Sequence, residues 1–142
     1  MFRLGIVLLA LMAAATPAFA QTKPAPRLRV FLDCSSCYQD YLRDQIKWVD
    51  FVRQPQDADV HILDNSNSTG GGGREVVVRF VGNGRFRTVD RELRVVTQAA
   101  DTDQRQRELM LRTISVGLLE YMARVQARPK VQEAMKAEGL IQ

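Results

Sequence analysis

The stretch Val30–Ile46, "VFLDCSSCYQDYLRDQI", changes its hydrophobic period at two cysteines and thereby sets the start of the fold. Up to Cys34, apolar and polar residues alternate in "RLRVFLD", which is typical of a half-buried strand over 28–34. From Cys37 onward, apolar residues recur at helical spacing, which predicts a helix over 37–46. A strand followed directly by a helix indicates a fold that mixes α and β elements.

The cysteine pair itself, Cys34-Ser-Ser-Cys37, allows two interpretations. Ser35 or Ser36 can cap the predicted helix, and a thiol at a helix amino terminus has a lowered pKa, so Cys34 or Cys37 could serve as the nucleophile of a thiol-disulfide oxidoreductase. However, the chain shows no second crossover helix and no proline placed as a thioredoxin-like site requires. We therefore favour a structural Cys34–Cys37 disulfide, closed in an oxidising compartment.

The first twenty residues are typical of a cleaved signal peptide. Arg3 is followed by an apolar segment over 4–15 that is short for a membrane span, and Ala18-Phe19-Ala20 forms a small-residue cleavage site. Cleavage would start the mature chain at Gln21, with a disordered, proline-containing lead-in over 21–27. We expect an exported, periplasmic protein without a transmembrane segment after cleavage.

Length and charge narrow the class further. The chain has 142 residues and a net charge of +4, from 20 basic and 16 acidic residues that are interspersed along it. Nucleic-acid binding proteins concentrate basic residues into a stripe, so we expect no nucleic-acid partner. The length indicates one domain, which we place over 28–128, followed by a short helix or tail over 129–142.

The remaining elements follow from the same periodicities. A strand over 48–53 is favoured by aromatic and β-branched residues, although this segment could instead prolong the preceding helix. Pro129 is expected to stop the last large helix, which Asp101 or Thr102 can cap. The other predicted elements are a strand over 58–64, a loop over 65–73, a strand over 74–81, a turn over 82–84, a strand over 85–98 that could be broken near Asp90, and an apolar helical stripe at Leu111, Ile114, Leu118, Tyr121, Met122 and Val125.

These elements predict an α/β sandwich with one mostly antiparallel sheet of about five strands, in the order β-α-β-β-β-β-α. The last three strands would form an antiparallel meander, and both helices would cover one sheet face. Phe31, Val77 and Val81 would then lie on the opposite face, where apolar side chains left uncovered would form an interaction surface.

The glycine-rich loop is a second candidate binding segment. A phosphate-binding loop would need a Gly-Lys-Ser/Thr ending and a following helix, whereas here an arginine and a strand follow. A flexible loop that contacts a partner is the better interpretation. Its residues are Gly70, Gly71, Gly72, Gly73 and Arg74.

No metal site or cofactor is expected. His61 is the only histidine, and structural zinc takes four ligands. In a haem-attachment motif a histidine would follow the second cysteine, and here that position is Tyr38.

From residue 48 onward, "WVDFVR", "ADVHILD", "REVVVRFV" and "RELRVVT" are similar in order to the amino-terminal domain of the Tol–Pal propeller protein and to the periplasmic domain of the curli secretion channel. Over 29–124, the run "VFLDC", "DYLR", "ADVHIL", "TGGGGRE" and "GLLEYMAR" resembles a family of bacterial cell-envelope proteins. In that family the domain precedes an outer-membrane β-barrel, so we expect a free-standing or truncated version here. The resemblance implies a fold and a location, and it implies no activity.

Two functions follow as expectations. The first is a non-enzymatic periplasmic module that binds a protein partner in the cell envelope, through its sheet edge, its apolar face or its glycine loop. The alternative is a periplasmic thiol-disulfide oxidoreductase that uses Cys34 and Cys37.

Overall fold

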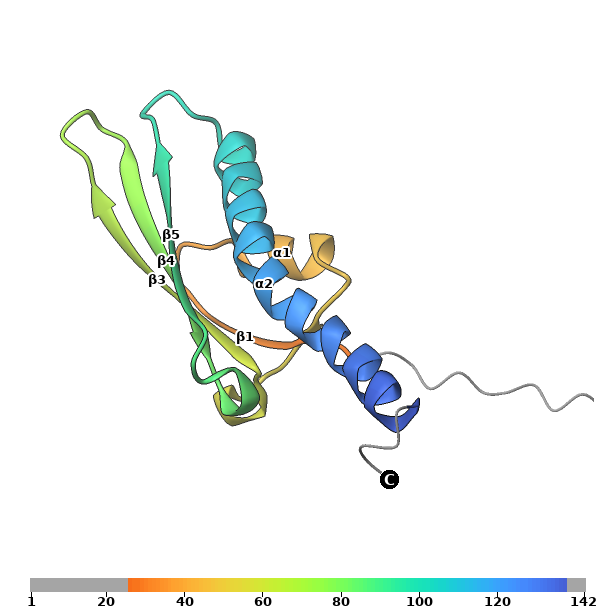
Figure 1. The fold of residues 1–142 in the computed structure, drawn as a ribbon. Coiled ribbons are helices and arrows are strands. Elements are labelled where there is room, and N and C mark those ends of the chain that lie inside the picture. The colour runs from red at the N-terminus through yellow and green to blue at the C-terminus, as the bar shows by residue number, and fades with distance from the viewer. Residues whose placement is uncertain (1–25, 138–142) are drawn as a thin grey trace, which may run out of the picture.

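The computed structural model describes residues 26–137 of the chain (Figure 1). The predicted signal peptide, most of the lead-in and the last five residues lie outside the described residues. The elements are β1 (Arg29–Asp33), α1 (Gln39–Gln45), β2 (Asp50–Phe51), β3 (Val60–Ser68), β4 (Arg74–Gly82), β5 (Asp90–Thr97) and α2 (Asp103–Ala137), with 3-10 turns η1 (Pro55–Asp57) and η2 (Gly84–Phe86).

The five strands form one sheet in the order β2-β1-β3-β4-β5, which confirms the predicted element order and the α/β class. The long ladders, β3 with β4 and β4 with β5, are antiparallel and form the predicted meander. The sheet is nevertheless mixed, because β1 pairs in parallel with β2 on one side and with β3 on the other. The first strand of the chain is thus an interior strand.

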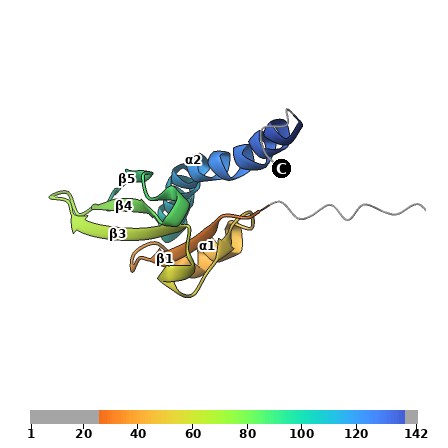
Figure 2. The same cartoon turned by 60° about the horizontal axis from the view of Figure 1, so that its bottom comes forward.

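Both helices lie on the same side of the sheet, as Figures 1 and 2 show. Alternate side chains of the strands point toward them and are buried, as the predicted alternation requires. Burial of each such side chain contributes about 1.5–3 kcal/mol to stability. The core includes Val30, Leu32, Val60, Ile62, Val76, Val78 and Phe80 of the sheet, Leu42 and Ile46 beside α1, and Met110, Ile114, Leu118, Tyr121 and Val125 of α2.

Within this core, Tyr121 joins α2 to the sheet by hydrogen bonds. Its side chain is fully buried, and its hydroxyl lies 2.5 Å from the carbonyl oxygen of Val89 and 3.2 Å from that of Phe80. A buried hydroxyl needs such a partner, because an unpaired one would carry the full desolvation cost. The same residue therefore ties α2 both to β4 and to the connection before β5.

The segment Asn65–Ser68, which we predicted as loop, is instead the second half of β3. It pairs in register with the start of β4, from Asn65 opposite Val77 to Ser68 opposite Arg74. The backbone ladder of the antiparallel pair extends the strand despite its polar side chains. β1 pairs with β3 only as far as Leu63, so this half of β3 has a free edge within the described residues.

The strand that we predicted over 85–98 begins only at Asp90, and the turn predicted over 82–84 is part of a longer connection. Residues 84–86 form η2, and Phe86 and Val89 turn inward and are buried at the end of the core. Gly82 lies against the backbone of Phe86 so closely that no side chain would fit there. The burial of Phe86 and Val89 in the core thus outweighs the strand propensity of residues 85–89.

Two further expectations are wrong at the chain's ends. Pro129 does not stop α2, which continues to Ala137. The fixed φ of proline is compatible with a helix, although its ring costs a backbone hydrogen bond and crowds the preceding turn. Arg27 does not belong to a disordered lead-in, because its guanidinium pairs with Asp50 at 3.0 Å and donates to the carbonyl of Val49 at 3.1 Å. The start of α2 is as predicted: the Thr102 hydroxyl accepts the backbone N–H of Arg105 at 3.2 Å.

The segment over 48–53, for which we left two structures open, does not prolong α1. The helix ends at Gln45, and only Asp50–Phe51 form a strand, the short edge strand β2. Trp48, which precedes it, is 37% exposed and so is not part of the core.

Candidate functional site

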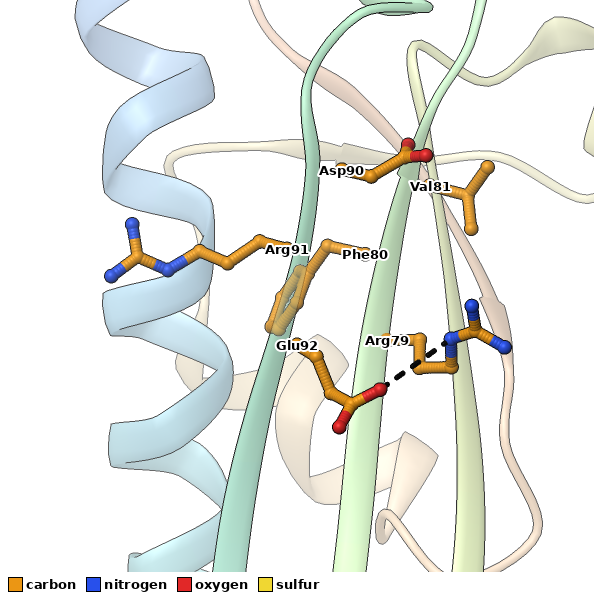
Figure 3. Close-up of a pocket in the computed structure, with 6 residues that line it drawn as sticks. All are labelled: Arg79, Phe80, Val81, Asp90, Arg91 and Glu92. Carbon is orange, nitrogen blue, oxygen red and sulfur yellow. Dashed lines mark ion pairs between the residues drawn. The ribbon is translucent and has the colours of Figure 1, made fainter.

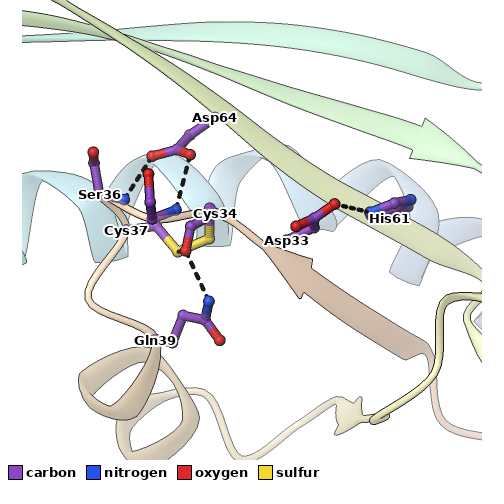
Figure 4. Close-up of a disulfide and its surroundings, with 8 residues drawn as sticks. Asp33, Cys34, Ser36, Cys37, Gln39, His61 and Asp64 are labelled. Carbon is purple, nitrogen blue, oxygen red and sulfur yellow. Dashed lines mark hydrogen bonds and ion pairs between the residues drawn. A yellow bond between two sulfur atoms is a disulfide. The ribbon is translucent and has the colours of Figure 1, made fainter.

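The cysteine pair links the end of β1 to α1 as a disulfide (Figure 4). Cys34 is 4% exposed and Cys37 is fully buried, and both belong to the hydrophobic core. A thiol-disulfide enzyme needs a sulfur that substrates can reach. The burial of both residues instead favours a structural role.

The turn between the two cysteines is held by hydrogen bonds to β3. Asp64 of β3 accepts the backbone N–H groups of Ser35 at 3.0 Å and of Ser36 at 2.8 Å (Figure 4). Both backbone donors of the turn between the cysteines are thus paired with one carboxylate of the neighbouring strand. The loop is thus held by an aspartate that the sequence did not reveal, because it lies about thirty positions away along the chain.

The serines do not cap α1, contrary to our prediction. α1 has seven residues and begins at Gln39, after Tyr38 in a left-handed conformation with φ 55°. The side-chain amide of Gln39 donates a hydrogen bond to the carbonyl of Cys34 at 2.7 Å and so stabilises the turn. Cys37 therefore lies just outside the helix, directly before the N-cap residue Tyr38.

The glycine-rich segment is divided by the structure. Gly70 and Gly71 form the tip of the β3–β4 hairpin, with open space around their Cα atoms, and Gly72 adopts φ +78°. Gly73 lies against the carbonyl of Thr97, and its own carbonyl accepts a hydrogen bond from the backbone N–H of Thr69 at 2.9 Å. The glycines therefore lie in the connection between β3 and β4, over residues 69–73.

Arg74 lies away from that tip, at the start of β4. It lines a polar groove of about 430 Å³ together with Ser35, Ser36 and Asp64, so the fold brings one end of the glycine segment next to the disulfide loop. The groove offers few kinds of chemical group, namely one cation, one carboxylate and hydroxyl groups. It shows no arrangement of a nucleophile with a base.

No described element covers the sheet face opposite the helices (Figure 1). Phe31, Val77 and Val81 lie on this face, as predicted, although each is half-buried rather than fully exposed. Leu63 lies among them. We call this surface the open face; it consists of Phe31, Asp33, His61, Leu63, Val77, Arg79, Val81, Glu92 and Arg94.

His61 lies on the open face, between Phe31 and Asp33. Its ring packs edge-to-face on Phe31, with 5.0 Å between centroids, and its Nε2 lies 3.2 Å from a carboxylate oxygen of Asp33. Among residues 26–137, no group of three or more His, Cys, Asp or Glu side chains is placed to hold a metal ion.

One side of the open face is hollowed between β4 and β5, where a depression of about 190 Å³ is lined by Arg79, Val81, Asp90 and Glu92 (Figure 3). Arg79 and Glu92 form an ion pair of 3.8 Å across the two strands, and Arg94 pairs with Glu92 at 3.4 Å. These charges are exposed and stabilise the fold little. They give the apolar centre of the face a rim of both signs, which is the composition of a protein–protein interface.

Comparison with models of known protein families gives no match for this chain, and comparison with curated proteins gives none. No helix within residues 26–137 combines the length and the apolar character that crossing a membrane requires. The arguments about function below rest on the geometry of the open face and on the sequence.

Proposed function

We propose that this chain is an exported, non-enzymatic module of the bacterial cell envelope that binds a protein partner through the open face. The leader sequence supports export, and the resemblance over 29–124 supports an envelope location. The observation that carries the proposal is the position of Phe31, Leu63, Val77 and Val81, which form an apolar surface that no described element covers.

The chemistry of this face suits a protein partner better than a small molecule. Its centre is apolar and nearly flat, and its hollow is too small for the enclosed cavities of about 300–1,000 Å³ that bind small ligands. A flat apolar centre within a charged rim can become fully buried only against another extended surface. Binding there would also protect the apolar side chains from water.

The alternative function, thiol-disulfide exchange, has weaker support. The two cysteines have the required spacing, but both are buried and lie beside the Asp64 carboxylate. An alkylation profile of the reduced protein against pH separates the two functions. We expect thiol pKa values at or above the ordinary value of about 8.5, and values well below it would favour the enzyme.

Binding is tested with a single substitution on the open face. Tagged protein covering residues 21–142 would be incubated with envelope extract, and Val81→Lys would be compared with the unsubstituted chain. Val81 lies directly opposite His61 and Asp90, so a lysine there is accommodated beside a carboxylate while it removes apolar surface. We expect the recovered partner to be lost with Val81→Lys.

The matched control is Leu119→Lys on α2. Leu119 is 59% exposed and lies on the helix, away from the open face, so this change also replaces an apolar residue by lysine. Equal recovery by both variants would contradict a role for the open face. The location is tested by fractionation, in which the mature protein is expected in the periplasm with Gln21 as its first residue.

A further inference from the structure

A buried aspartate organises the end of the sheet that lies opposite the β3–β4 hairpin tip. The side chain of Asp59, just before β3, is 8% exposed. It accepts the backbone N–H of Arg29 at 3.0 Å and contacts the guanidinium of Arg29 at 3.3 and 3.4 Å. Its second cationic neighbour is Arg85, with a nitrogen to oxygen distance of 3.7 Å.

This arrangement leaves two guanidinium groups with a single carboxylate between them. Among the described residues, neither Arg29 nor Arg85 forms an ion pair with any acid other than Asp59. Arg85 is further held over the ring of the buried Phe86, at 4.7 Å from the ring centre. Arg85 is 30% exposed and Arg29 is 53% exposed, and both retain N–H donors that Asp59 does not use.

A third guanidinium completes the surroundings. The guanidinium of Arg27 forms an ion pair with Asp50 at 3.0 Å and donates a hydrogen bond to the carbonyl of Val49 at 3.1 Å. Its side chain remains 48% exposed. We call the resulting pocket of about 570 Å³ the arginine pocket; its polar lining consists of Arg27, Arg29, Gln56, Asp59, Asn83 and Arg85.

The lining contains three guanidinium groups, two carboxamides and only one carboxylate, which is already paired. Planar guanidinium groups bind phosphate oxygens through two parallel hydrogen bonds, and fixing them beforehand reduces the entropy lost on binding. We propose that the arginine pocket binds a phosphate group, carried either by a lipid headgroup or by a soluble phosphate compound. This site adjoins one end of the open face, because Arg29 and Asp59 lie two residues before Phe31 and His61 along the chain. Its ligand is proposed independently of the function proposed above.

The probe is inorganic phosphate, titrated into protein covering residues 21–142 at constant ionic strength, with chloride as the reference anion. Amide shifts of Asn83, Gly84 and Arg85 would be followed by NMR. We expect saturable shifts with phosphate and none with chloride. Arg85→Gln should weaken the apparent affinity about tenfold or more, since it removes a charge-assisted contact.

Arg79→Gln is the matched control, because it removes the same charge from the open face and should leave the affinity within about twofold. If Arg85→Gln unfolds the chain, Arg27→Gln at the exposed edge of the pocket takes its place. Equal affinities of the pocket and control variants, or shifts that do not saturate, would overturn the proposal.

A second arm identifies the source of the phosphate. Vesicles of phosphatidylcholine with and without phosphatidylglycerol would be sedimented with the protein. Co-sedimentation that requires phosphatidylglycerol and is lost in Arg85→Gln assigns the site to a lipid headgroup. Protein that binds phosphate but stays in the supernatant assigns it to a soluble phosphate compound.

Discussion

At the scale of single residues, Tyr121 shows how one polar group can specify the contact between a helix and a sheet. Apolar contacts alone would let α2 shift along the sheet with little change in buried area. The hydroxyl of Tyr121 has acceptors at only one position, the carbonyls of Phe80 and Val89. The residue thus fixes where the helix lies.

Tyr121→Phe should lower the free energy of unfolding by about 1–2 kcal/mol, because it removes these hydrogen bonds and leaves the ring packing intact. Urea unfolding monitored by circular dichroism measures the change. An unchanged midpoint would show that water replaces the hydroxyl.

The same residue predicts a pH dependence. Burial, with smaller contributions from the carboxylates of Asp90 and Glu120, raises the pKa of Tyr121 from 10.0 to about 12. The folded state therefore keeps the proton that the unfolded state loses. The stabilisation is complete below about pH 10 and is lost as the pH rises to about 12. Unfolding curves across this range should fall more steeply for the unsubstituted chain than for Tyr121→Phe.

The disulfide between Cys34 and Cys37 also contributes to stability. It closes a loop of four residues, so it restricts the unfolded chain little and should contribute about 2 kcal/mol. The double variant Cys34→Ala/Cys37→Ala should fold and lose about that amount in urea unfolding. Dithiothreitol should lower the stability of the unsubstituted chain and leave the double variant unchanged; loss of the fold on reduction would contradict this small role.

At the scale of elements, α2 packs tightly against the sheet at Gly117. A side chain at this position would overlap the ring of Phe80 in β4. The sequence alone indicates an apolar stripe on this helix but not which residue must be small, because that depends on the partner strand.

Gly117→Ala should therefore destabilise the fold by about 1–3 kcal/mol, although alanine favours helix more than glycine does. Val116→Ala is the control, since Val116 is 44% exposed and the change should stay within about 0.5 kcal/mol. Thermal unfolding of the two variants compares them. A gain in stability for Gly117→Ala would mean that Phe80 can move aside.

Elements whose buried side chains recur at a regular spacing could be predicted from the sequence. Elements whose structure depends on pairing or packing with a distant part of the chain could not. β1, β4 and the apolar stripe of α2 have clear periods, and the structure confirms them. Asn65–Ser68 is polar and becomes strand only through its pairing with β4. Arg85–Val89 has strand propensity and becomes a turn because the core needs Phe86.

The candidate sites follow the same division. The cysteine pair was visible as a motif, and the apolar residues of the open face followed from alternation along the strands. The arginine pocket was not visible, because Arg29, Asp59 and Arg85 lie far apart in the sequence and meet only after β1 has inserted beside β3.

At the scale of the whole molecule, the described part of α2 extends beyond the packed core. Val125 is the last buried side chain described on α2, and the described side chains beyond it are exposed. Figure 2 shows the end of α2 running past the sheet.

Removal of residues 129–142 should therefore leave the free energy of unfolding within about 0.5 kcal/mol of the full chain. A matched truncation after Leu118 would remove Tyr121 and Val125 from the core and should prevent folding. Circular dichroism and urea unfolding distinguish the outcomes. A large loss of stability on removal of residues 129–142 would place the domain boundary later than residue 128.

The interior position of β1 has a consequence for when this protein can fold. A ribosome releases the chain amino terminus first, yet β1 obtains its partner in β3 only thirty positions later, and Phe80 obtains its covering helix only after residue 110. Contacts of such long sequence separation form late, so the nascent polypeptide has no stable core until almost all of it has been synthesised. A chain that stays unfolded throughout synthesis remains suited to passage through a narrow translocation channel.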